Sequence, residues 1–363
     1  MGSAAAFHLA KRGQRVLALD RFAPPHGFGS SHGQTRIIRE AYFEHPVYVP
    51  LVQRAYELWT ELEQASGCEL FRQTGGLMIG RPDSAVVSGA RRSAQDHRLE
   101  HRILSAAEVR RQFPALRPTD EMTAVWEPRA GILFPEACIA AHLMMARREG
   151  ATLRCDEPVV RWEPEGDGVR VFTGGGEYSA RQMLLTAGSW TKALLPDWNL
   201  PLSVERQVQF WFEPKLPDAF LPDRCPVHLW EYEPGQYFYG FPDLGDGVKV
   251  AVHHQGEVTG PDSIRREVAP SDVDSMRRLI ERFLPGANGA LRSAVVCMYT
   301  NTPDSHFLLD RLPGFPQVLV ASPCSGHGFK FSSSIGEGLA EWLIAGRARF
   351  DLELFGWRSG IQG

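Results

Sequence analysis

The chain has no long hydrophobic run. Nowhere in its 363 residues does an apolar stretch approach the roughly eighteen residues that a membrane-spanning helix needs. Its first residues show no basic region followed by an apolar stretch and a cleavage site, as a secretory signal peptide would. With 43% hydrophobic and 23% charged residues, the composition is that of a globular protein with two lobes, and we expect it in the cytoplasm with no membrane partner.

Basic residues do not gather in any part of the sequence. The 39 Lys and Arg residues are dispersed among 43 Asp and Glu residues, and the formal net charge is -4. Nucleic-acid binding therefore has no electrostatic support. An anionic ligand would have to be held by a local cluster of cations.

The cysteines and histidines show none of the common metal or catalytic spacings. Neither C-x-x-C nor zinc spacing occurs, no two histidines stand at i, i+4 ligand spacing within a predicted helix, and the turn 187–190 lacks the G-x-S-x-G elbow of the α/β-hydrolases. Ser189 and Glu136 thus carry no hydrolase or metal assignment, and we expect no bound metal. The chain has six cysteines, Cys68, Cys138, Cys155, Cys225, Cys297 and Cys324, and most of them are expected to be buried and reduced.

The start of the chain resembles the second half of a dinucleotide-binding βαβ unit. Small residues at 2–6 begin a helix, Gly13 ends it, and an apolar strand at 16–19 leads to Asp20. The first strand and the first glycines of G-x-G-x-x-G are not present, so only Gly2 could belong to that motif. An ordinary helix-strand pair remains the alternative interpretation of these residues.

Hydrophobic periodicity predicts the elements that follow. Helices are expected at 48–65, 82–95, 106–113, 135–148, 271–284 and 328–344. In the fifth of these, Ser271 and Asp274 stand at capping-box spacing. Strands are expected at 76–80, 122–126, 182–186, 294–299 and 317–321, with a hairpin at 159–172. Alternating aromatic-rich runs from 202 to 253 predict an antiparallel sheet with one solvated face.

Three separated motifs carry a family resemblance. They are S-H-G-Q-T-R-I-I-R at 31–39, C-M-Y-T-N-T-P-D at 297–304 and S-G-H-G-F-K-F at 325–331. Together they resemble the monomeric sarcosine oxidase and N-methyltryptophan oxidase family of covalent flavoproteins, within the glycine/D-amino-acid oxidase group. The likeness extends in order over nearly the whole chain.

The resemblance implies an α/β (α+β) fold. An FAD-binding Rossmann-like domain lacking its first strand would be interleaved with an antiparallel-sheet substrate domain. The expected division gives 1–80, 135–200 and 290–363 to the FAD-binding domain and 81–134 and 201–289 to the substrate domain. A family member would have roughly a dozen more residues before Met1, which hold the first strand and turn of the βαβ unit, so we expect an N-terminal truncation.

The resemblance also implies how FAD is held. Cys297 would carry the flavin through a thioether, whereas the alternative is a buried structural cysteine. Attack by the sulfur needs a thiolate and therefore cationic neighbours, which His32 and Arg36 would supply. Further cofactor contacts are implied at Gly2 beside the pyrophosphate, Asp20 at the ribose, Arg21, Val159, and the turn of Gly326, Gly328, Phe329 and Lys330 with N–H groups facing the flavin.

Substrate contacts follow from the same resemblance. Arg39 and Lys330 would together bind an amino-acid carboxylate. Tyr239 and His253 would line the cavity, and Lys249 would activate oxygen on the opposite flavin face, so that the catalytic set is Lys249, Arg36, His253 and Tyr239. Lys249 and His253 are four residues apart and share one face of a strand. The alternative for Lys249 is a surface charge after the turn at 246–247.

These expectations predict a monomeric enzyme. It would use FAD and O2 to demethylate secondary N-methyl amino acids, of the sarcosine or N-methyltryptophan type, giving the amino acid, formaldehyde and H2O2. Two alternatives remain open at this point. One is a truncated, non-catalytic flavoprotein-fold remnant, and the other is an oxidase of cyclic imino acids such as pipecolate.

Overall fold

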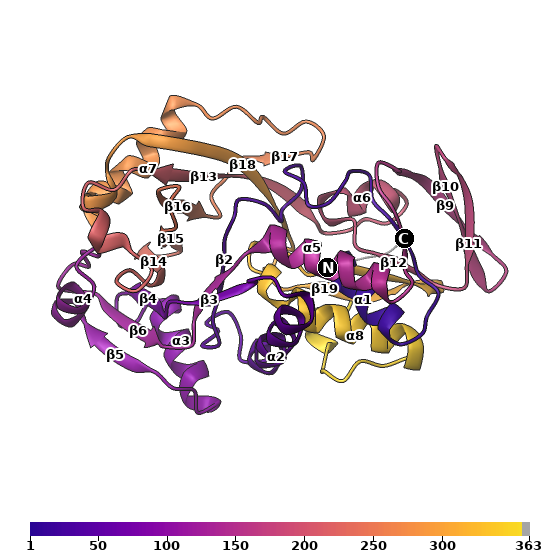
Figure 1. The fold of residues 1–363 in the computed structure, drawn as a ribbon, viewed down its shortest axis with the longest axis horizontal. Coiled ribbons are helices and arrows are strands. Elements are labelled where there is room, and N and C mark those ends of the chain that lie inside the picture. Colours follow the sequence, from indigo (N-terminus) through magenta and orange to yellow (C-terminus); the bar gives the residue numbers. More distant parts are fainter. Residues whose placement is uncertain (358–363) are drawn as a thin grey trace.

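The computed structural model describes residues 1–357 and has two lobes side by side along its longest axis (Figure 1). One lobe is built on a large, mostly antiparallel sheet, and the other on small sheets, with both parallel and antiparallel strand pairs, covered by helices. The helices are α1 (Gly2–Lys11), α2 (Tyr48–Ser66), α3 (Ala85–Asp96), α4 (Ala106–Gln112), α5 (Pro135–Arg148), α6 (Thr191–Leu194), α7 (Pro270–Phe283) and α8 (Ser332–Ala345). Among the described residues, no helix is both long and apolar enough to cross a lipid bilayer.

The strands divide between the lobes. The large sheet contains β4 (Gly76–Gly80), β5 (Arg102–Ser105), β6 (Thr123–Glu127), β13 (Ser203–Phe212), β14 (Val227–Glu233), β15 (Gln236–Asp243), β16 (Val248–His253), β17 (Val258–Thr259) and β18 (Leu291–Asn301). The smaller sheets contain β1 (Leu17–Leu19), β2 (Arg36–Ile38), β3 (Phe71–Gln73), β7 (Gly131–Leu133), β8 (Thr152–Arg154), β9 (Val159–Glu165), β10 (Gly168–Thr173), β11 (Gly176–Ala180), β12 (Met183–Leu185), β19 (Leu308–Leu312) and β20 (Phe315–Ser322).

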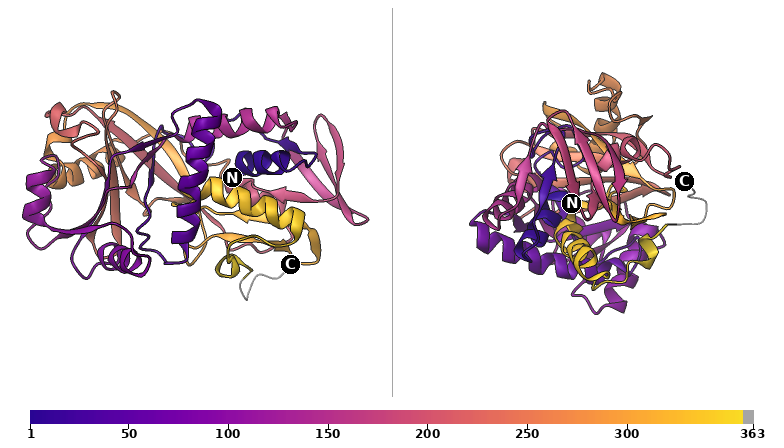
Figure 2. Two further views of the ribbon diagram at one scale, coloured as in Figure 1. Left: turned by 60° about the horizontal axis from the view of Figure 1, so that its bottom comes forward. Right: turned by 90° about the vertical axis from the view of Figure 1, so that its right-hand side faces the viewer.

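In the helical lobe, small residues let two helices approach closely. Ala4, Ala5 and Ala6 of α1 are buried, and a Cβ added to Gly336 of α8 would lie 2.5 Å from the Ala4 Cβ. Parallel pairs β1–β8 and β12–β20 lie in this lobe, and Figure 2 shows α1, α5 and α8 gathered around them. The fold class predicted from the sequence is confirmed.

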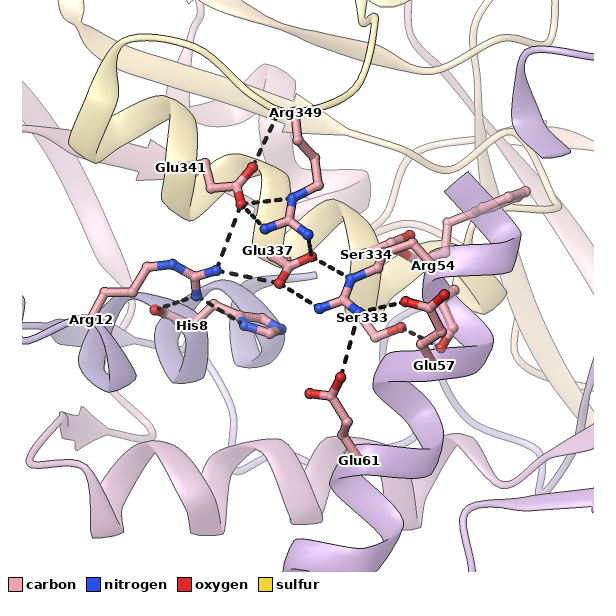
Figure 3. A network of polar contacts seen from close by, with 12 residues as sticks. His8, Arg12, Arg54, Glu57, Glu61, Ser333, Ser334, Glu337, Glu341 and Arg349 are labelled. Carbon is pink, nitrogen blue, oxygen red and sulfur yellow. Dashed lines mark hydrogen bonds and ion pairs between the residues drawn. The ribbon is translucent and has the colours of Figure 1, made fainter. Parts of the chain in front are cut away.

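A network of ion pairs joins α1, α2 and α8 on the outside of this lobe (Figure 3). Glu337 of α8 is 4% exposed at its side chain, and its carboxylate accepts from Arg54 at 2.8 Å and from Arg12 at 3.3 Å. Arg349 lies 3.2 Å from the same carboxylate. Because the three arginines come from three parts of the chain, Glu337 fixes α8 relative to its neighbours.

The large sheet has the order β17-β13-β16-β15-β14-β4-β6-β5, with β18 on β13. One face packs against α7 through Phe212, Trp230, Phe238 and Val250, which are buried in one core cluster. The opposite face was expected to be solvated, and this expectation is wrong. Polar side chains such as Lys249 and Gln209 are buried there because residues 33–35, between β1 and β2, lie against them.

Several boundaries differ from the sequence prediction. The last helix begins at Ser332, because residues 329–331 form a 3-10 turn that precedes it. The capping box of α7 uses Asp272, which accepts from the Ala269 amide at 2.9 Å, rather than Ser271 and Asp274. The domain division stays a prediction. β4 and β18 both belong to the large sheet, whereas the expected boundaries at 80 and 290 assign them to the FAD-binding domain.

Candidate active site

The inner face of the large sheet presents four of the predicted site residues, namely Tyr239, Lys249, His253 and Cys297. Strand pairing sets Trp211 opposite both Lys249 and Ser293, and it sets Gln207 opposite Cys297. Side chains of paired residues point to the same side of a sheet, and alternate residues of a strand share a face. Lys249 and His253 therefore point to the same side, about 13 Å apart along β16 at ~3.3 Å per residue.

The segment between β1 and β2 lies on this face and is held by Lys249. The Lys249 ammonium donates to the carbonyl oxygens of Gly33 at 2.5 Å and Thr35 at 3.0 Å. It is 1% exposed and lies 5.2 Å and 4.9 Å from the ring centres of Trp211 and Phe241. Burial, with the nearby Arg36 charge, lowers the pKa of Lys249 well below its usual value. The alternative of a surface charge is wrong.

Cys297 lies beside a fixed cation. Its sulfur is 3.9 Å from the Arg36 Nη2, and the cysteine is 1% exposed. Arg36 is held in turn by the carbonyl oxygens of Ser30, His32 and Thr35, at 2.6 to 2.7 Å. The three carbonyls thus hold the guanidinium next to the sulfur, and a cationic neighbour of this kind is what attack of a cysteine on a flavin requires.

His32 does not contribute a positive charge. Burial, reinforced by the Arg36 charge, lowers the pKa of His32 to about 4, so the ring is neutral at pH 7. The expectation that His32 and Arg36 both supply cations is thus wrong for His32. Its Nε2 is buried and has no hydrogen-bond partner among the described residues.

Arg39 and Lys330 meet at one buried aromatic ring. The Arg39 guanidinium carbon is 4.2 Å and the Lys330 ammonium 5.1 Å from the ring centre of Tyr42. The ammonium also donates to the His327 carbonyl at 2.7 Å and to the Tyr42 hydroxyl at 3.2 Å. Burial, followed by repulsion from Arg39, lowers the pKa of Lys330 to about 7. The predicted pair of cations is therefore brought together.

Glu44 is a member of the site that the sequence did not reveal. Its two carboxylate oxygens lie 2.9 and 2.8 Å from the Arg39 Nη2. Burial raises the pKa of Glu44, but Arg39, His327 and Lys330 outweigh burial, so the pKa is lowered overall. An acid five residues after Arg39 in a loop has no diagnostic spacing in the sequence. Only the folded loop shows that Glu44 pairs with the arginine.

Tyr239, His253 and Tyr299 form an aromatic wall next to the turn that precedes α8. The Tyr239 and His253 ring centres are 6.2 Å apart, and the His253 Nδ1 is 3.1 Å from the Tyr299 hydroxyl. Gly326 has a φ of +75°, and a Cβ there would lie within 2.9 Å of the His253 and Tyr299 rings. Tyr299, two residues after Cys297 and on the same face of β18, could have been predicted from strand alternation.

Comparison with known proteins decides the family. Residues 1–342 match the family described as FAD dependent oxidoreductase, abbreviated DAO. The chain belongs to this family. A monomeric sarcosine oxidase of Streptomyces avermitilis is 45% identical over 360 residues, covering 98% of this chain and 94% of the relative.

Two further matches extend the comparison. An N-methyl-L-tryptophan oxidase of Salmonella arizonae is 36% identical over 357 residues, covering 98% of this chain and 95% of the relative. The structure of NikD, an unusual amino acid oxidase essential for nikkomycin biosynthesis, superimposes with a TM-score of 0.86 at 23% identity, covering 99% of this chain and 95% of that chain. This structural likeness shows the fold. Matches over nearly full length disfavour the non-catalytic remnant.

The other predicted contacts of the DAO cofactor lie in the helical lobe or next to α8. A Cβ on Gly2 would lie 2.6 Å from the Thr186 Oγ1, so only glycine lets α1 begin so close to the end of β12. The Asp20 carboxylate accepts from the Phe22 amide at 2.8 Å and keeps 41% of its side chain exposed. It is therefore accessible to a ribose hydroxyl.

The remaining predicted cofactor contacts differ from one another in exposure and packing. Arg21 is paired with Asp262 at 2.8 Å on the surface, whereas Val159 packs with Leu19 beside a core cluster. In the turn before α8, Phe329 stacks on Trp59 with ring centres 6.2 Å apart. A Cβ on Gly328 would overlap the Pro323 carbonyl oxygen. The turn is thus close-packed around its glycines.

The residues present fit FAD at both ends. Cys297 with Arg36 offers an attachment point for the flavin, and Gly2 with Asp20 offers the nucleotide contacts expected of a βαβ unit. The unpartnered His32 Nε2 and Gln209 Oε1, both buried on the sheet side, are polar atoms that a polar ligand would satisfy.

Proposed function

We propose that this FAD-dependent oxidoreductase oxidises secondary N-methyl amino acids with O2, giving the amino acid, formaldehyde and H2O2. The observation that carries the proposal is the convergence of Arg39 and Lys330 on the buried Tyr42 ring, in a site that also contains the Cys297–Arg36 pair. FAD, when bound, supplies the acceptor for a hydride equivalent and returns the electrons to oxygen. The names of the relatives support the substrate class.

Arg39 and Lys330 bind the substrate carboxylate in this proposal. Two converging cations fix the orientation of an α-amino acid as well as its affinity. Since Glu44 already occupies Arg39, a substrate carboxylate must share the guanidinium with it or displace it. The neighbouring cations and the half-buried Tyr239–His253 wall favour the uncharged form of the substrate amine, because a cation would lose hydration there.

Cys297 is the proposed attachment point of the flavin. If the purified protein is precipitated with acid, the yellow colour should stay in the pellet. Cys297→Ser should release the colour into the supernatant. Cys225→Ser, at another fully buried cysteine, should keep it in the pellet. Colour that leaves the unchanged protein on precipitation would contradict the linkage.

Lys249 is the proposed oxygen-activating residue. In Lys249→Met, the reduced enzyme should be reoxidised by O2 at least about a hundredfold more slowly, as expected when a charge that acts only in the reaction is removed. The rate at which substrate reduces the enzyme without O2 should change little. An unchanged reoxidation rate would refute this role.

The substrate class is tested by product analysis. Sarcosine or N-methyltryptophan should give H2O2 and formaldehyde in equal amounts. Pipecolate, the cyclic alternative, has no N-methyl group and can give H2O2 without formaldehyde. If only pipecolate yielded peroxide, the demethylation proposal would fail while flavin-dependent oxidation would stand.

Three further expectations, on oligomeric state, cellular location and domain division, belong to this proposal. The word "monomeric" in the relative's name supports a monomer. A cytoplasmic location stays a prediction from the sequence. The division into an FAD-binding and a substrate domain is also proposed, with the catalytic groups between the helical lobe and the inner face of the large sheet.

A further inference from the structure

A cavity of about 310 Å³ lies between the large sheet and the segment that covers it. Its floor comes from two strands, β13 and β18, and its roof comes from the loop before β2. Its lining includes His32, Gly33, Gln34, Trp211, Ser293 and Val295. None of the predicted substrate residues, Arg39, Tyr239, His253 and Lys330, lines it.

Strand register places this cavity on the lysine side of the site. Trp211 and Ser293, both in its floor, are paired with each other, and Trp211 is also paired with Lys249. His253 lies four residues further along β16, toward the row of Cys297. The cavity and the aromatic wall are therefore at opposite ends of the row of site residues.

Only a thin wall separates the cavity from the Lys249 ammonium. Gly33 lines the cavity, and its carbonyl oxygen accepts from Lys249 at 2.5 Å. Trp211 lines it too, and its ring centre is 5.2 Å from the same ammonium. A Cβ on Gly33 would overlap the Gln209 side chain, so the loop can lie this close to the sheet only with glycine there.

The cavity is open to solvent through exposed residues. Gln34 and Ser293 are exposed, whereas Val295 is half-buried and His32 and Trp211 are buried. The cavity thus extends from the exposed side chains of Gln34 and Ser293 to the buried rings of His32 and Trp211. Glu136 also lines it and accepts from the Gly33 and Gln34 amides, whereas no lysine or arginine of the described chain does, so the cavity suits a small neutral molecule better than an anionic amino acid.

We propose that this cavity is the portal through which O2 reaches Lys249 and H2O2 leaves, separate from the route of the amino acid. The inference rests on the proposed function. The reaction served is the transfer of two electrons and two protons from the reduced flavin to O2, which yields oxidised flavin and H2O2. The cavity residues guide the two small molecules and take no part in this transfer.

Two thiols introduced into the cavity test the portal. Val295→Cys probes access: in the native holoprotein, iodoacetamide should alkylate the introduced thiol, as measured by peptide mass spectrometry. Ser293→Cys at the mouth then allows the passage to be blocked with a pyrene maleimide. The same reagent applied to the unchanged protein provides the control, since it labels the accessible native cysteines such as the exposed Cys68.

Blocking the mouth should affect the reaction with oxygen alone. After reduction with dithionite, the labelled Ser293→Cys protein should be reoxidised by O2 about tenfold or more slowly than the labelled control, because access then limits the encounter. Anaerobic reduction by sarcosine should keep its rate. A complete label without a change in reoxidation would overturn the portal, as would failure of iodoacetamide to reach the Val295→Cys thiol.

The outcomes separate this inference from the proposed function. Dithionite reduces the flavin whatever the natural substrate is, so a wrong substrate class leaves the test of the portal intact. Equal slowing of both half-reactions would mean that the label distorts the site, and it would overturn the portal. A protein that holds no flavin would overturn both proposals.

Discussion

At the scale of single residues, the pairing of Arg39 with Glu44 governs how a carboxylate can bind. The same guanidinium that should receive the substrate already contacts both oxygens of the half-buried Glu44, at 2.9 and 2.8 Å. Two carboxylates on one arginine repel each other, so the internal acid weakens the binding of an external one. Affinity at this site is thus a competition between Glu44 and the ligand.

Removing the negative charge of Glu44 should tighten carboxylate binding. In Glu44→Gln, the Kd of methoxyacetate, a carboxylate without an amine, should fall about tenfold, which corresponds to ~1.4 kcal/mol. The Kd can be measured from the change in flavin absorbance on titration. Glu40→Gln is the control, since Glu40 is a buried acid of the same segment that pairs with Arg129 at 3.1 Å instead. An unchanged Kd in Glu44→Gln would contradict the competition.

The charge of Lys330 should make binding depend on pH. Its pKa is lowered to about 7 by burial and then by Arg39, so the free enzyme loses this cation as the pH rises through 7. The Kd of methoxyacetate should therefore increase with pH between 7 and 9, whereas in Lys330→Met it should be larger throughout and independent of pH.

The other groups that face Lys330 do not titrate in that range. The pKa of His327 is lowered to about 4, that of Glu44 is lowered, that of Tyr42 is raised well above its usual value, and that of Arg39 is raised. A pH dependence that persisted in Lys330→Met would assign it to another group. The folded-state pKa of Lys330 lies below its usual 10.5, so this group makes unfolding less favourable as the pH rises from 7 to 10.5.

Residue identities could be predicted from the sequence where a motif carried them, and not where a contact depended on the fold. Arg36 and Cys297 were assigned from motifs and Lys249 from the wider family resemblance, and the structure brings all three to the inner face of the large sheet. Glu44 was missed because its role arises from a loop that folds back on Arg39. The charge of His32 was misjudged because burial, which the sequence does not show, decides its protonation.

At the scale of elements, α8 depends on its ion-pair network as well as on apolar packing. Glu337 is buried on the side of α8 that faces α1 and α2 (Figure 3). Burial raises the pKa of Glu337, but hydrogen bonding and charge from Arg54 outweigh burial and lower it overall. The turn at 326–331, which holds Lys330, leads directly into this helix.

Glu337→Gln should destabilise the protein by about 3 kcal/mol, since the change leaves three arginines without their shared carboxylate. Urea unfolding at pH 7 measures this loss. Because the folded-state pKa of Glu337 is lowered from 4.5, the difference from the unchanged protein should be full above pH 4.5 and disappear as the pH falls through the lowered pKa. Glu341→Gln, at a more exposed acid of the same helix with 18% side-chain exposure, should cost under about 1 kcal/mol. Equal losses in both variants would contradict the central role of Glu337.

Element positions followed the sequence most closely where local signals were strong. The helix expected at 135–148 begins with Pro135 and ends at Arg148 as predicted, because proline favours the first helical turn. The start of α8 was misplaced by four residues, since the glycines at 326 and 328 stop a regular helix until Ser332. The inner face of the sheet was expected to be solvated because it carries polar side chains. Some of them are buried instead against a loop that lies far away in the sequence.

At the scale of the whole molecule, the site exists because one segment connects the two lobes. The chain between β1 and β2 leaves the helical lobe after Asp20 and ends against the large sheet, where Gly33 and Thr35 accept from Lys249. The aromatic wall, the cation pair and Cys297 thus come from distant parts of the sequence. Their identities could be predicted separately, but their distances needed the fold.

The most direct test of the central claim is one anaerobic turnover. The purified protein is mixed with sarcosine in the absence of O2, while the flavin absorbance is followed and formaldehyde is then measured. We expect the flavin band to bleach and one formaldehyde to form per flavin reduced, with both lost or greatly slowed in the double variant Arg39→Gln, Lys330→Met. Bleaching without formaldehyde, or equal rates in the double variant, would contradict oxidative demethylation at this site.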